Sequence, residues 1–234
     1  MRPFRRVHLF GLITLGLAGF VWAVGTPLKP AQGDYQVLRD GKEVGHATLA
    51  LRESGGDTWE YSSETRGTKG MASFLGLDVV EKSTFRWRDG KAEGLHYDYR
   101  QSAAIKHKDR TIDFDWNAQR ANVSDNGKSF SYPIPAGTVD RSTVALALGV
   151  SLADGAREAT LPVAVRDHVE QQHFVARATE KINVPAGSFD AIRVERTDAP
   201  GKGSSWYAPS VSVLPLRVEQ VQGDGSKIVM ELRH

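Results

Sequence analysis

Short segments in which apolar and polar residues alternate run through most of this chain, and they constrain its fold more than any other feature. Leu95–Arg100 alternates Leu, Tyr and Tyr with His, Asp and Arg, and Ile112–Trp116 alternates large apolar residues with aspartates. A period of two is typical of β-strands with one buried face. Dipeptides suited to tight hairpin turns, such as Asp40-Gly41 and Asn126-Gly127, separate the segments. The chain is therefore predicted to be mainly antiparallel β-structure.

The closing part of the chain shows the same organisation. A strand ending before Pro185-Ala186-Gly187 is followed by predicted strands over Phe189–Arg196, Ser204–Ala208 and Leu214–Gln220. Together these segments predict an antiparallel meander.

One helix interrupts the pattern. Ser142 is predicted to cap a helix that runs to about Ala153, with an apolar side containing Val144, Leu146, Ala147, Val150 and Leu152. Lys69–Leu77 is expected to form a short helix or an apolar loop. About a dozen strands with one apolar face must close over that face. We therefore predict an all-β fold, a single curved sheet that closes as a barrel, half-barrel or β-spiral, with one or two short helices and the main helix plugging the open side.

The first 25 residues have the features of a cleavable signal peptide. Arg2, Arg5 and Arg6 precede the uncharged apolar run Leu9–Val24, and small residues allow cleavage after Ala23 or Gly25. We expect residues 26–234 to form a single β-rich periplasmic domain. It would have no lipid anchor through cysteine, since the chain contains none, and no stable transmembrane anchor after cleavage.

The charge balance argues against nucleic acid as a partner. The chain has 30 Lys and Arg residues and 28 Asp and Glu residues. Without the three arginines of the signal segment, 27 basic residues face 28 acidic ones, a net charge of −1. A near-neutral chain with interspersed charges lacks the basic surface that nucleic-acid binding requires.

Five segments carry a resemblance to a known family. They are YQVLRDGKEVGHATLALRESGGDTWEY, VVEKSTFRWRDGKAEGLHYDYRQS, VDRSTVALAL, VPAGSFDAIRVE and SWYAPSVSVLPLRVEQ. In this order they resemble two opening hairpins, the helix start and the closing meander of the bacterial family called domain of unknown function 3108. The resemblance implies an exported, mainly periplasmic protein of Gram-negative bacteria with a curved antiparallel sheet. It implies no established activity.

Candidates for catalysis are few. Asp113 and Asp115 share one face of a strand, and paired carboxylates can hydrolyse glycosides, but a solvated strand face is the simpler interpretation. His96 is the third candidate. Ser142 lacks the sequence around a hydrolase nucleophile and is better read as a helix cap. The histidines have no spacing typical of a metal site, so no metal and no cofactor is expected.

Candidate binding residues come from the aromatic and basic positions. Core packing accounts for most of the strand aromatics, but some are candidates to line a cavity or its rim. Trp206 and Tyr207 are adjacent, so they should point to opposite faces, with one exposed or at a rim. Basic residues on neighbouring hairpins could face an anionic lipid or glycan. The weak ligand-binding candidates are Arg86, Arg88, Tyr97, Tyr99, Arg100, Trp206 and Tyr207.

Three hypotheses for function follow. The leading one is a non-enzymatic cell-envelope protein that binds a lipid, another amphipathic small molecule or an envelope protein. The alternatives are an envelope hydrolase of glycan or ester, using Asp113, Asp115 and His96, and a scaffold that binds envelope proteins through strand edges. An apolar cleft would favour the first, close carboxylates in a cleft the second, and a fully packed interior the third.

Overall fold

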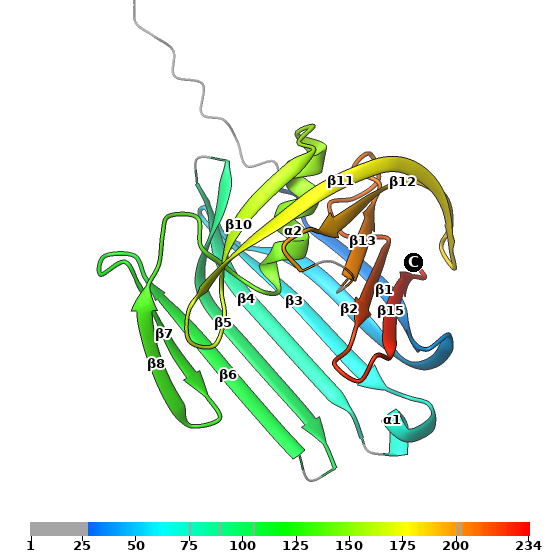
Figure 1. The fold of residues 1–234 in the computed structure, drawn as a ribbon, viewed down its shortest axis with the longest axis horizontal. Coiled ribbons are helices and arrows are strands. Elements are labelled where there is room, and N and C mark those ends of the chain that lie inside the picture. Colours follow the sequence, from blue (N-terminus) through cyan, green and yellow to red (C-terminus); the bar gives the residue numbers. More distant parts are fainter. Residues whose placement is uncertain (1–27, 75, 89, 105, 200, 202) are drawn as a thin grey trace, which may run out of the picture.

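The computed structural model describes residues 28–234 except 75, 89, 105, 200 and 202 (Figure 1). The predicted signal segment therefore lies outside the described residues. The elements in this part of the chain are β1 Ala31–Arg39, β2 Lys42–Gly55, β3 Thr58–Gly67, α1 Gly70–Phe74, β4 Asp78–Arg88, β5 Lys91–Ala103, β6 Lys106–Asp115, β7 Arg120–Asp125, β8 Lys128–Pro133, β9 Val139–Asp140, α2 Thr143–Ala153, β10 Glu158–Ala164, β11 Val169–Val184, β12 Gly187–Arg196, β13 Gly203–Tyr207, β14 Arg217–Val221 and β15 Lys227–Leu232.

These strands form one sheet in the order β8-β7-β6-β5-β4-β3-β2-β1-β15-β14-β13-β12-β11-β10-β9. Apart from β8–β9 and β9–β10, strands that follow one another in sequence pair as antiparallel neighbours, and β1 pairs antiparallel with β15. The short strand β9 is parallel to β10. The first and last strands are thus neighbours in the middle of the sheet, and β8 and β9 form its two edges.

The sheet curls so that β9, at one edge, lies against the inner face of β5, near the other edge (Figure 1). The amide of Gly94 in β5 donates to the carbonyl of Thr138, next to β9, at 3.0 Å. The Ser83 hydroxyl of β4 donates to Asp140 of β9 at 2.7 Å. The ladder is not closed, so the predicted curved sheet is confirmed in its spiral form.

The predicted turns are confirmed where the structure describes them. Asp40 and Gly41 have φ angles of 49° and 78°, and Asn126 and Gly127 have 50° and 77°. Two successive positive φ angles are what a tight hairpin turn matched to strand twist requires. In the closing meander, the last predicted strand begins at Arg217 rather than Leu214.

Helix α2 lies inside the curl, as Figure 1 shows. It is buried nearly all round rather than on one side, which fits its uniformly apolar sequence. The expected cap is wrong, since Ser142 has a helical backbone conformation and makes no side-chain capping bond. Instead, the carboxylate of Asp140 accepts from the amides of Ser142 and Thr143 at 2.9 and 3.0 Å.

The strand aromatics mostly pack in the core, as predicted. Trp59, Tyr61, Phe85 and Tyr97 on β3–β5 are all buried. Their side chains point into the curl, where the main apolar cluster surrounds α2.

Trp206 and Tyr207 point to opposite faces of β13, and they belong to different apolar clusters. The expectation that one of them is exposed is wrong, because Trp206 is 7% exposed and Tyr207 is fully buried. The outer face of β13 is covered by a separate cluster that includes Ile182, Val184 and Leu216. An arm formed by β11 and β12 therefore buries a surface that alternation alone would leave open.

Candidate functional site

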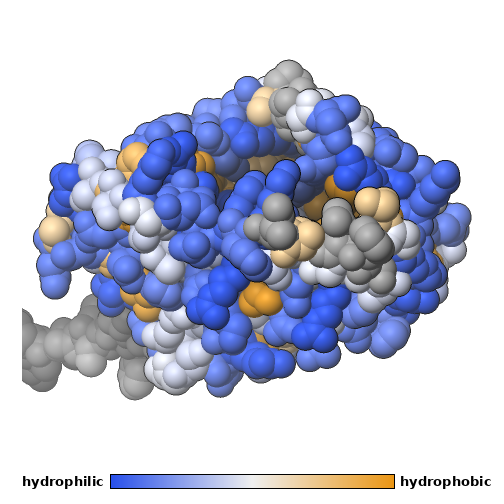
Figure 2. Space-filling model, turned by 90° about the horizontal axis from the view of Figure 1, so that it is seen from below, coloured by the Kyte–Doolittle hydropathy of each residue, from blue (hydrophilic) through white to orange (hydrophobic). Residues whose placement is uncertain are grey.

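A cavity of about 540 Å³ lies inside the curl, between the inner faces of β2–β4, the start of α2 and the strands β11–β15. Its volume falls within the range of about 300–1,000 Å³ typical of small-molecule sites. Figure 2 shows the molecule from below, with hydrophobic surface inside a hollow and hydrophilic residues around it. The spiral therefore encloses a recess that is not filled by its own side chains.

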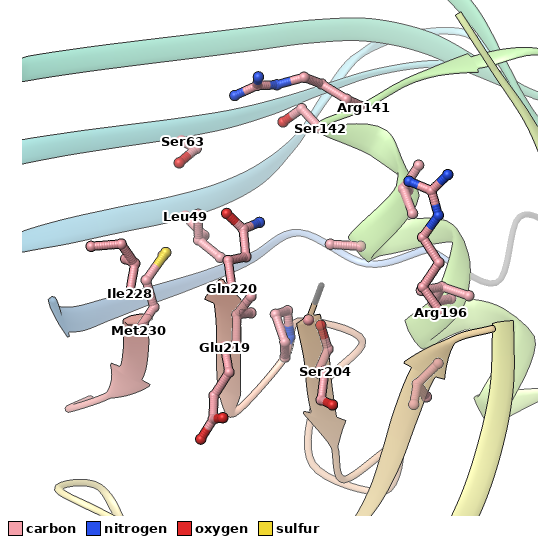
Figure 3. A pocket seen from close by; sticks show the side chains of 18 of the residues that line it. Leu49, Ser63, Arg141, Ser142, Arg196, Ser204, Glu219, Gln220, Ile228 and Met230 are labelled. Atoms are coloured by element: carbon pink, nitrogen blue, oxygen red, sulfur yellow. The ribbon is translucent and has the colours of Figure 1, made fainter. Parts of the chain in front are cut away.

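The wall of this cavity is largely apolar. Leu49 comes from β2, Val144 and Leu148 from α2, and Phe174 and Val194 from β11 and β12. Further apolar side chains are contributed by Val37, Val79, Ala145, Pro215, Val218, Val221, Ile228 and Met230. Ile228 and Met230 lie beside Leu49 and Gln220 in Figure 3. A wall of this kind favours an apolar ligand.

Glu81 and Arg141 form the best-defined polar contact of the wall. The Arg141 Nη2 and Nε atoms donate to the two carboxylate oxygens of Glu81 at 2.6 and 3.1 Å. Tyr97 donates its hydroxyl to Glu81 at 2.8 Å, and the Arg141 guanidinium lies 4.9 Å from the ring centroid of Tyr99. Burial lowers the pKa of Arg141, but the Glu81 carboxylate outweighs it and raises that pKa overall. The charges at this point of the wall are balanced.

Arg196, which is labelled in Figure 3, and Gln172 form a second polar part of the wall. Arg196 Nη2 donates to Asp198 at 2.6 Å and to Glu170 at 3.0 Å. Gln172 donates to the same Glu170 carboxylate at 2.9 Å. The hydrogen bond from Arg196 lowers the pKa of Asp198 to about 2, against the opposing effect of burial. Arg196 is thus held in place by two carboxylates.

Serine and threonine hydroxyls lie on one inner strand face. Ser63 and Thr65 follow Tyr61 at every second position of β3, and all three line the cavity. Ser205 lies on the inner face of β13, the face that it shares with Tyr207, and also lines the cavity. The site therefore combines an apolar wall with hydroxyl groups that can hydrogen bond to a ligand.

Asp140 lies behind this wall and positions it. Its fully buried carboxylate accepts from Ser83, from the amides of Ser142 and Thr143, and from the Thr143 hydroxyl. Burial raises the pKa of Asp140, and these hydrogen bonds oppose the increase. By tying β4 to the start of α2, Asp140 determines where Arg141 and Ser142 meet the cavity.

The seven predicted binding residues are not brought together. Arg86 and Arg100 are on the outer face, where they pair with Glu93 and Asp98 at 2.8 Å each. Arg100 has a side chain that is 74% exposed. Arg88 is also exposed. Arg88 and Arg100 belong to a solvated strand face, whereas the Arg86–Glu93 pair is mostly buried, with side chains 22% and 14% exposed.

The four predicted aromatic residues lie inside the sheet or under the β11–β12 arm. Tyr97 and Tyr99 touch the cavity only indirectly, through Glu81 and Arg141. Tyr207 donates its hydroxyl to the carbonyl of Ala145. None of the seven predicted residues is among the described residues that line the cavity. Their role in ligand binding stays a prediction.

The catalytic candidates lie outside the cavity. His96 Nδ1 lies 2.7 Å from the Asp113 carboxylate, which is 66% exposed on the outer face. Asp115 accepts from the amide of Ala118 and so stabilises the following turn. Within the described residues, no group of three or more His, Cys, Asp or Glu side chains is arranged to hold a metal ion.

The sequence did not single out Arg141 and Arg196 as wall residues, and it left Tyr61 among the strand aromatics that pack in the core or line a cavity. A signal for Tyr61 was present, because the inner positions of β3 change from Trp59 and Tyr61 to Ser63 and Thr65. A change from aromatic to hydroxyl side chains along one strand face is expected where a packed core gives way to a cavity. Arg141 and Arg196 have no comparable signal, since their neighbours across the curl are far away in sequence.

Fold and site together define an all-β protein, with one spirally curved antiparallel sheet around an internal helix and an adjoining cavity. The chain belongs to the family described as protein of unknown function (DUF3108), whose model matches residues 34–233. The family resemblance seen in the sequence is therefore confirmed.

A solved structure shares the fold. It is the crystal structure of a beta-barrel-like protein of domain of unknown function DUF1849 from Brucella abortus. The TM-score is 0.52 at 11% sequence identity, over 87% of this chain and 95% of the other. None of the curated proteins matches the chain. Among the described helices, neither α1 nor α2 has the length and hydropathy needed to cross a membrane.

Proposed function

We propose that this protein binds an apolar or amphipathic small molecule in the cavity, as a non-enzymatic component of the cell envelope. The observation that carries the proposal is the apolar cavity of about 540 Å³ beside α2, with hydroxyl and charged groups on its wall. Apolar surface of a ligand that is buried here would contribute about 25 cal/mol of favourable binding free energy for each Å² removed from water. The signal-like segment 1–25 supports a periplasmic location.

The hydrolase alternative has less support. The carboxylates that line the cavity, Glu81 and Glu219, are each engaged by a basic side chain, Arg141 and Lys227 respectively. A general acid and base would need free carboxyl groups close to a bound substrate. The scaffold alternative requires no cavity, so the cavity favours ligand binding over it.

The first experiment is native mass spectrometry of the full chain expressed in a Gram-negative host and purified from its periplasm without detergent. The proposal predicts a mature chain that starts after Ala23 or Gly25 and carries a stoichiometric amphiphile. Lipid extraction and fragmentation would then identify the molecule. An intact mass that includes residues 1–25 would contradict cleavage of the signal segment, absence of the chain from the periplasmic fraction would contradict the location, and a clean apo mass would exclude a tightly bound ligand.

A cavity-filling substitution tests the site itself. Ala145 lines the cavity from α2, so Ala145→Trp should reduce binding of the neutral fluorescent probe N-phenyl-1-naphthylamine at least tenfold. Ala153 is exposed at the end of the same helix, and Ala153→Trp should leave binding within about twofold. Fluorescence titration measures both. Equal binding by the two variants would place the probe outside the cavity and contradict the proposed site.

A further inference from the structure

The hydroxyl group of Tyr61 distinguishes it from the other buried tyrosines near the cavity. Tyr61 is only 2% exposed and lines the cavity, yet its hydroxyl forms no hydrogen bond with any described residue. The hydroxyls of Tyr35 and Tyr207, by contrast, donate to the carbonyls of Pro215 and Ala145 at 2.8 and 2.9 Å. Among the described residues, the completely buried side-chain atoms without a partner are Asp78 Oδ1 and Arg217 Nε, so the Tyr61 hydroxyl keeps accessible surface at the cavity and can donate to a ligand. Phenylalanine would fill the same space without this donor.

Tyr61 is a hydrogen-bond donor at any physiological pH. Burial, together with the charges that Tyr35, Tyr207 and Glu81 would carry, raises its pKa well above the ordinary value. The hydroxyl therefore remains protonated. Thr65, which also lines the cavity, lies four residues, or about 13 Å, further along β3 toward α1. A ligand oxygen that accepts from the Tyr61 hydroxyl would lie beside the apolar wall.

The charges on the wall are already balanced. The charged side chains among the described residues that line the cavity are Glu81, Arg141, Arg196 and Glu219. Glu81 and Arg141 pair with each other, Arg196 pairs with Asp198, and Lys227 lies 3.2 Å from Glu219. An anionic head group would find no uncompensated cation at this wall, and burying an unpaired charge is strongly unfavourable.

We infer that the ligand is an uncharged lipid-like molecule whose carbonyl oxygen accepts a hydrogen bond from the Tyr61 hydroxyl. This inference rests on the proposed binding function and adds the ligand class and the residue that selects it. The acyl or other hydrocarbon part lies against Leu49, Leu148 and Phe174. Tyr61 discriminates between an ester or similar carbonyl compound and a plain hydrocarbon of equal length.

The test measures displacement of N-phenyl-1-naphthylamine by three competitors with twelve-carbon chains: methyl laurate, laurate and dodecane. The native protein should bind methyl laurate more tightly than both others, and laurate at least tenfold more weakly than the ester. Tyr61→Phe should weaken methyl laurate binding roughly threefold to tenfold, the net value of one neutral hydrogen bond. Its binding of dodecane should stay within about twofold.

Tyr132→Phe is the matched control. Tyr132 is buried, does not line the cavity and donates its hydroxyl to the carbonyl of Val165, so the substitution should change none of the three affinities. Equal effects of Tyr61→Phe on the ester and on dodecane would overturn the inference while leaving the binding function intact. Laurate binding as tight as that of the ester would overturn the assignment of an uncharged ligand. No binding of the fluorophore or of any competitor would refute the proposed function itself.

Discussion

At the scale of single residues, carboxylates hold the cavity wall in place. Asp140 is the central case, because its four hydrogen bonds join β4, β9 and the first turn of α2. Each helix begins with amides that have no partner within the helix, and a carboxylate there also suits the helix dipole. Asp140 thus fulfils a structural need and at the same time orients Arg141 toward Glu81.

Asp198 has a similar role beside Arg196, and its pKa makes that role testable. The pKa of Asp198 is about 2 in the fold, below the ordinary value of 3.8. The ionised Asp198 carboxylate therefore contributes its full stabilisation of the fold above about pH 4, and this stabilisation is lost as the pH falls toward 2.

We expect Asp198→Asn to lower the free energy of unfolding by about 0.5–1 kcal/mol at pH 6, because solvent screens the charge of this exposed carboxylate. The difference from the native protein should shrink as the pH falls from 4 to 2, because protonation removes the same charge. Urea unfolding at pH 6, 4 and 3 measures it. A difference that stays constant over this range would show that the Asp198–Arg196 contact does not depend on the charge of Asp198.

At the scale of elements, α2 depends on close approach as much as on apolar burial. Gly149 lies in the middle of the helix, where a Cβ atom would come within 1.9 Å of the Val213 carbonyl oxygen. The helix therefore packs against the backbone of the β13–β14 connection. This contact sets the distance between α2 and the strands that line the other side of the cavity.

Gly149→Ala should destabilise the protein by about 1–3 kcal/mol, although alanine favours a helix by about 1 kcal/mol. Chemical denaturation gives the value. Gly223→Ala is the control, since no atom lies within 4 Å of a Cβ there, and it should change stability by less than about 0.5 kcal/mol. A Gly149→Ala variant that is more stable than the native chain would mean that α2 can move away from Val213.

At the scale of the whole molecule, the ends of the described chain meet in the middle of the sheet. Arg233 donates its amide to the Asp34 carbonyl at 2.7 Å, and Asp34 donates its amide to His234 at 2.8 Å. Pairing of β1 with β15 requires residues almost the whole chain apart to find each other. Such non-local pairing is expected to make folding slow.

The same geometry predicts that the chain tolerates circular permutation. A short Gly/Ser linker from His234 to Leu28, which is part of the buried core, with new ends between Gly55 and Gly56, should keep the β1–β15 pairing. Gly55 ends β2 and Gly56 begins the turn that follows, and both are exposed. We expect a cooperative thermal transition within about 5 °C of the native one, and unchanged binding of the fluorescent probe. Loss of cooperativity would contradict the central position of β1 and β15.

The sequence by itself determined the local structure. Alternation along segments such as Leu95–Arg100 predicted the strands, positive-φ turn residues such as Asn126 and Gly127 predicted the hairpins, and the run Thr143–Ala153 predicted the helix. These features could be predicted because each depends on residues that are close neighbours in the sequence. The curved all-β sheet followed as well, since so many half-apolar strands must close over a common core.

Only the tertiary structure decided which form of closure the sheet takes and which residues face the cavity. The edge of the sheet at β9 lies against the inner face of β5, and the β11–β12 arm covers Trp206. The buried Asp140 takes the place of Ser142 as the cap of α2. Pairs such as Glu81 and Arg141 are 60 residues apart in sequence. Alternation specifies that a side chain points inward but not what lies opposite, because that depends on how far the whole sheet curls.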